Sequence, residues 1–203
     1  MIEKVTVGSR VQKVIDKLFP RIERCFPGAI LAGGAIRDME IGKCYPNDLD
    51  FFVPFDGTIQ EATLRLLNEG LCSISVGKAD YHFTCRDIET NVKERLTWGS
   101  GSKENLNVLF YHDDSDCGKV EIILSPIAAD TIGQWYVAFQ QIPLNTGYMF
   151  ADGRKIIPAA MRADLDTKRV TVMVMGNRLQ RARAEDLARR FGWPLNEVRS
   201  FRT

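Results

Sequence analysis

The spacing of apolar residues predicts helices at three places along this chain. Residues 10–26 repeat their apolar side chains at near-helical intervals, so we expect a helix there that packs on a sheet. Pro20 should kink or break it. Residues 58–69 show a second amphipathic pattern, with Thr58 as the expected N-cap and Gly70 as the stop. Residues 177–193 predict a third helix, which is rich in arginine.

Short segments rich in β-forming residues separate these helices. We expect strands at 29–32, 48–53, 71–76, 81–86, 105–111, 119–124 and 134–144. A short helix should follow the first strand and end near Gly42, and Asp152-Gly153 is typical of a two-residue hairpin turn. The acidic segment 112–118 reads as a solvated turn, because it lacks the ligand spacing of a calcium loop.

Two carboxylates share one face of the strand expected at 48–53. Alternate side chains of a strand point the same way, so Asp48 and Asp50 lie side by side while Leu49 turns to the core. Like charges at this spacing repel each other unless a cation lies between them. Mg²⁺ suits such a pair, because it is bound through one or two carboxylates together with substrate phosphates.

The residues before this acid pair extend the pattern to a longer motif. The motif comprises Gly33, Gly34, Arg37, Asp38, Gly42, Lys43, Asp48 and Asp50. It resembles the head-domain signature of the tRNA CCA-adding enzymes and bacterial poly(A) polymerases, over roughly an eighth of the chain. The alternative interpretation is a strand–turn–helix unit with a solvated acidic strand end.

The resemblance implies a nucleotidyltransferase fold of the α/β (α+β) class and a metal-dependent reaction. We expect a mixed, mainly antiparallel sheet that carries the acids on one face, with helices on the other. Asp48 and Asp50 would be catalytic metal ligands for two Mg²⁺ ions, with Mn²⁺ as a possible substitute. Glu121, in an apolar strand, resembles the family's third carboxylate. Its alternative is an edge-strand Glu that faces water.

The same resemblance assigns binding roles. Gly33, Gly34, Arg37, Asp38 and Lys43 would bind the NTP, with glycine amides approaching its phosphates and Asp38 able to anchor Arg37. The family's Arg-Arg-Asp segment is absent from residues 136–141, so base preference does not transfer. The arginines expected to hold the acceptor are Arg178, Arg181, Arg183 and Arg190. Their alternative is a solvated face with ion pairs to Glu185 and Asp186.

The composition of the chain indicates what class of protein it is, but it says little about which reaction the protein catalyses. The chain has 203 residues, a net charge of +1 and 45% hydrophobic residues, which is ordinary for a globular protein. We expect a catalytic domain at 1–175 and a basic C-terminal helix within 176–203. No apolar run is long enough for a membrane span, and the N-terminus lacks a signal peptide, so we expect a cytoplasmic protein. The five scattered cysteines do not predict a zinc site.

The sequence therefore predicts transfer of NMP from an NTP to an acceptor hydroxyl, with an RNA, most plausibly a tRNA 3′ end, implied by the resemblance. A nucleotidyltransferase toxin, an enzyme that modifies a protein or small molecule, and a non-catalytic NTP-binding module of the same fold stay open. The oligomeric state is not indicated.

Overall fold

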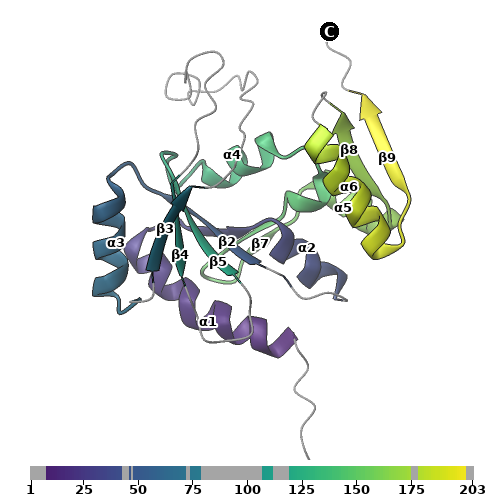
Figure 1. Ribbon diagram of the computed structural model, residues 1–203. Helices are drawn as coiled ribbons and strands as arrows, with labels where there is room; N and C mark the ends of the chain where they lie inside the picture. Colours follow the sequence, from purple (N-terminus) through teal and green to yellow (C-terminus); the bar gives the residue numbers. More distant parts are fainter. Residues whose placement is uncertain are drawn as a thin grey trace, which may run out of the picture.

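The computed structural model describes residues 8–42, 46, 48–71, 74–78, 107–111, 119–174 and 178–199. Seven described strands form one sheet: β1 (Ile30–Ala32), β2 (Asp48–Pro54), β3 (Ile74–Lys78), β4 (Asn107–Tyr111), β5 (Lys119–Ser125), β6 (Tyr148–Phe150) and β7 (Lys155–Ile156). Their order is β3-β4-β5-β2-β1-β6-β7 (Figure 1). Only the β2–β5 pair among them is parallel, which confirms the mixed, mainly antiparallel sheet.

Two long helices cover one face of this sheet. They are α1 (Gly8–Cys25) and α3 (Ile59–Asn68). The expected capping of α3 is confirmed, because the Glu61 amide donates to Thr58 Oγ1 at 3.2 Å and the Thr58 amide donates to Glu61 Oε2 at 2.8 Å. We expected Pro20 to kink or break the helix; it does not break it, since α1 continues through Pro20. Pro20 lies on the exposed side, while buried Phe19 and Ile22 anchor both halves of the helix to the sheet.

A further helix, α4 (Ile132–Phe139), packs on the opposite face of the sheet. Its Tyr136 and Trp135 rings lie 4.8 Å and 6.2 Å from the ring of Phe52. The strand expected at 134–144 is therefore wrong, because this segment holds α4 and the 3₁₀ turn η1 (Pro143–Asn145). Its aromatic and β-branched residues favour strands intrinsically, but burial on one helical face overrides that preference.

The C-terminal part is a smaller β-α-β unit (yellow-green in Figure 1). The parallel strands β8 (Val170–Val174) and β9 (Leu195–Arg199) flank α6 (Arg178–Phe191), which confirms the helix expected at 177–193. The sequence did not predict these two strands. Together with η1 they enclose a separate core: Ile142, Leu144, Val170, Val172, Ala184 and Leu187. The boundary expected at residue 175 falls inside this unit, which α5 (Ala159–Thr167) joins to the sheet.

The hairpin between β6 and β7 is one residue longer than expected. The Phe150 amide donates to the Arg154 carbonyl at 3.1 Å, which leaves Ala151, Asp152 and Gly153 between the paired residues. Gly153 has a φ of 84°, as the last position of a three-residue loop requires. None of the described helices is long and apolar enough to cross a membrane.

Several sequence expectations lie outside the described residues. They are the strand at 81–86, the acidic turn at 112–118, Lys43, and the cysteines Cys44, Cys72, Cys85 and Cys117. The remaining cysteine, Cys25, is buried as a free thiol.

Candidate active site

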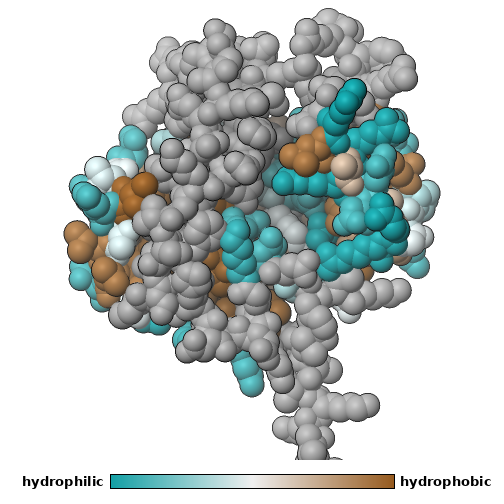
Figure 2. All heavy atoms as spheres, in the orientation of Figure 1, coloured by the Kyte–Doolittle hydropathy of each residue, from teal (hydrophilic) through white to brown (hydrophobic). Residues whose placement is uncertain are grey.

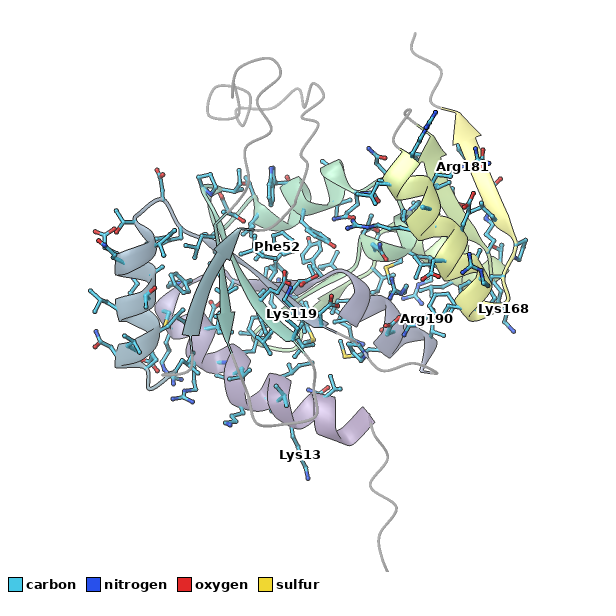
Figure 3. The ribbon with its side chains drawn as sticks, viewed as in Figure 1. Lys13, Phe52, Lys119, Lys168, Arg181 and Arg190 are labelled. Atoms are coloured by element: carbon cyan, nitrogen blue, oxygen red, sulfur yellow. The ribbon has the colours of Figure 1, made fainter. Side chains whose placement is uncertain are left out.

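The parallel pairing of β2 with β5 brings the expected acids together. Asp50 is the direct partner of Glu121 and Asp48 is the direct partner of Lys119, so all four side chains share one face. Leu49, between the aspartates, is fully buried on the opposite face. Paired strands lie about 4.8 Å apart, which makes the three carboxylates close neighbours. Figure 3 shows Lys119 near the centre of the molecule.

The carboxylates of Asp48 and Asp50 are in an environment that disfavours negative charge. Burial raises the pKa of Asp50 well above its usual value, and the charges of Asp48 and Glu121 raise it further. Burial, followed by the charge of Glu121, also raises the pKa of Asp48. Among the described residues Asp50 Oδ1 is buried and has no hydrogen-bond partner. A buried oxygen of this kind is satisfied by a cation, so the aspartate pair fits a hard metal ion.

Glu121 has a different partner. It is 8% exposed, and its Oε1 pairs with Nζ of Lys119, which comes from the same strand two residues earlier. Within the described part of the chain, no three His, Cys, Asp or Glu side chains are arranged so that they could hold a metal ion. Asp48 and Asp50 are therefore the two candidate metal ligands, and Glu121 as a third ligand stays a prediction.

The Gly33-Gly34 turn lies against this acidic face. Gly33 has a φ of 81°, and a Cβ there would lie 3.1 Å from Oη of Tyr136 and 3.6 Å from Oδ2 of Asp50. Glycine is thus required by both conformation and space. The Gly33 amide donates to the Gly147 carbonyl at 3.2 Å, so this amide is already used within the fold. The first-turn amides of α2 (Gly34–Ile41), which an α-helix leaves without intrahelical acceptors, are the ones placed for an anion.

Arg37 and Asp38 point into the protein. Arg37 Nε donates to Asp38 Oδ1 at 2.7 Å, and Arg37 NH1 donates to Asn145 Oδ1 at 2.7 Å. The second Asp38 oxygen lies 3.3 Å from NH2 of Arg190. Arg37 is 6% exposed and Asp38 is 1% exposed. Both expected nucleotide-binding side chains are thus held in an internal network.

The four C-terminal arginines are in different environments. Arg178 and Arg183 are exposed on α6, and the positive charge of Arg183 lowers the pKa of Asp50 against the larger effect of burial. Arg181 pairs with Glu185 at 3.1 Å and with Glu197 at 3.0 Å. Arg190 turns inward to Asp38, at the other end of α6 from Arg181 (Figure 3).

Hydrophilic side chains dominate the visible face of the C-terminal unit (Figure 2). The ion pair expected between an arginine and Glu185 is present, and Asp186 pairs with Arg189 at 3.2 Å.

Sequence reasoning missed three side chains that contact the candidate site or the network beside it. They are Lys119, Tyr136 and Asn145. Lys119 could have been predicted from the sequence, since it precedes Glu121 by two positions and must share its face of the strand. Tyr136 lay in a segment assigned to the wrong element, and Asn145 is 108 residues from its partner Arg37.

Comparison with solved structures confirms the fold. A CCA-adding enzyme in complex with ATP matches with a TM-score of 0.62 at 16% identity, over 94% of this chain and 41% of that one. A tRNA nucleotidyltransferase complexed with a primer tRNA and an incoming ATP analog gives 0.51 at 16% identity, over 90% and 46%. The Bacillus stearothermophilus CCA-adding enzyme in complex with CTP gives 0.53 at 14% identity, over 92% and 41%.

The chain thus spans less than half the length of these structures. No protein-family model and no curated protein matches it. Similarity at this level of identity shows the nucleotidyltransferase-type fold and nothing finer.

Proposed function

We propose that this protein transfers NMP from an NTP to an acceptor hydroxyl and releases pyrophosphate. The observation that carries the proposal is the aspartate pair on β2, packed against a glycine turn, with a buried Asp50 oxygen that has no described partner. In the described fold these features adjoin the N-terminus of α2, where an anionic phosphate is favoured.

A metal ion fits the donor set, which consists of carboxylate oxygens. Asp48 and Asp50 would hold Mg²⁺ or Mn²⁺, and Glu121 could join them if Lys119 moved to a phosphate. When bound, such an ion neutralises phosphate charge and lowers the pKa of the attacking hydroxyl. The protein's own part is positioning: the Gly33-Gly34 turn admits the phosphates closely, and the Lys119 ammonium adds positive charge beside them.

We propose RNA, with a tRNA 3′ end foremost, as the acceptor. Two observations support this choice: solved structures of the same fold include a complex with a primer tRNA, and exposed arginines lie on α6. Arg178, Arg181 and Arg183 would contact the phosphate backbone, which fixes position without reading sequence.

The test is incubation with each labelled NTP, Mg²⁺ and separate pools of tRNA, other RNA and protein. Label on tRNA that is lost in Asp48→Ala and Asp50→Ala would support the proposal. Label on protein alone would instead indicate a protein-modifying enzyme. NTP binding without any transfer would indicate a non-catalytic module.

A further inference from the structure

A buried ionic network joins the glycine-motif helix to the C-terminal unit. Asp38 accepts from Arg37 through one oxygen at 2.7 Å and contacts Arg190 through the other at 3.3 Å. Arg37 and Asp38 belong to α2, whereas Arg190 belongs to α6 and lies 152 residues after Asp38. A carboxylate that is 1% exposed needs such partners, since an unpaired buried charge is costly.

Aromatic and amide groups complete the network. The Phe191 ring lies 5.6 Å from the guanidinium carbon of Arg37 and 5.6 Å from that of Arg190, within the range of a cation–π contact. Asn145 of η1 accepts from Arg37, and its backbone carbonyl accepts from Tyr136 of α4 at 2.7 Å. Three stretches of chain that are distant in sequence, namely α2, α4 with η1, and α6, therefore meet around one arginine–aspartate pair.

The position of Arg190 on α6 links this network to Arg183, one of the arginines expected to hold the acceptor. Arg183 precedes it by seven residues, which is two helical turns, so the two arginines share one face of α6 about 10 Å apart. Fixing Arg190 to Asp38 sets the rotation of α6 about its own axis, and the face that carries both arginines then turns toward α2, where Asp38 lies.

We infer that Asp38 and Arg190 form a clasp that positions α6 against α2, and with it Arg183, which lies on the same face of the helix. Arg37 and Asp38 then act as positioning residues and not as nucleotide ligands. One part of this role rests on the proposed function: the contact of Arg183 with a phosphate of the acceptor next to the site. The mechanical part, the docking of α6, is independent of any reaction.

The first test measures hydrogen exchange of the α6 amides in the full chain without nucleotide. Arg190→Gln should accelerate exchange by about fivefold or more, since a contacting pair couples strongly. Arg189→Gln is the matched control, because Arg189 immediately precedes Arg190 and its ion pair within the described residues is local, to Asp186 at 3.2 Å. Arg190→Lys keeps the charge and should restore most of the protection. Equal exchange in Arg190→Gln and Arg189→Gln would overturn the clasp.

The second test separates positioning from nucleotide binding. In the labelled-NTP assay, Arg190→Gln should raise the KM for the acceptor several-fold more than Arg189→Gln does, while NTP affinity stays unchanged. If Arg190→Gln weakened NTP binding as much as it weakened acceptor binding, Arg37 and Asp38 would be assigned to the nucleotide, and the positioning role would be overturned. If the parent protein transfers nothing, the proposed function fails, and the exchange result still decides the clasp.

Discussion

Replacing Asp50 by Asn should stabilise the metal-free protein, which is an unusual expectation for a candidate catalytic residue. Burial raises the pKa of Asp50 well above the usual value of an aspartate, so the folded state binds this proton more tightly than the unfolded state. Folding stability therefore falls as pH rises from the unfolded value through the higher folded value, and the full cost is present above the latter.

The size of the effect follows from the environment of Asp50 Oδ1, which is buried without a hydrogen-bond partner among the described residues. Leaving a buried polar group unsatisfied costs about 1–3 kcal/mol, and more if it is charged. Asparagine keeps the volume and removes the charge. For a domain of this size each kcal/mol changes Tm by about 2–4 °C, so we expect a gain of roughly 3 to 10 °C.

Thermal unfolding followed by circular dichroism in EDTA measures this gain. It should be largest at neutral pH and shrink as pH falls toward 4, because below the unfolded-state pKa the Asp50 carboxyl is protonated in both the folded and the unfolded parent protein. Asp56→Asn, at an exposed position beyond β2, is the control and should leave Tm unchanged. A lower Tm for Asp50→Asn at neutral pH, or a gain that does not depend on pH, would refute the reasoning.

Three further predictions concern the same site. Asp48→Ala and Asp50→Ala should each abolish nucleotide transfer with the circular dichroism spectrum unchanged, and full activity in both variants would remove the assignment. Changing Arg178, Arg181 and Arg183 together should weaken RNA binding and reduce its salt slope by roughly one unit per lost phosphate contact, with NTP affinity as the control. Gly33→Ala should cost about 1–3 kcal/mol of unfolding free energy in urea, because its φ of 81° is strained for alanine; a neutral result would mean that the turn relaxes.

The parts of the fold that the sequence predicted are those fixed by local patterns. The periodicity around Leu18 and Ile22 in α1, the Thr58 cap of α3 and the apolar run of β5 each depend on neighbouring residues alone. The segment of α4 failed for the opposite reason. Its Trp135 and Tyr136 have strand-forming side chains, and their burial against Phe52 is a tertiary contact that no local pattern contains.

In the candidate site too, the features set by local sequence were predictable and those set by contacts between distant segments were not. Alternation along β2 placed Asp48 and Asp50 on one face, and the structure agrees. The pairing of Glu121 with Asp50 requires the parallel register of two strands separated by a long stretch of chain. The pairing of Glu121 with Lys119 adds a competing cation, which the resemblance gave no reason to expect.

Arg37 and Asp38 show why a motif does not fix the role of its residues. An arginine next to a glycine turn fits a phosphate by charge alone, and the sequence reading followed that chemistry. The partners that redirect it, Asn145 and Arg190, lie 108 and 152 residues from Arg37 and Asp38. Both oxygens of Asp38 contact guanidinium groups, and Nε and NH1 of Arg37 donate to Asp38 and Asn145. Removing one partner of the buried Arg37–Asp38 pair would leave an uncompensated charge, which costs about 3–5 kcal/mol. These contacts are the reason we infer that the Arg-Asp dipeptide holds α2 and α6 together.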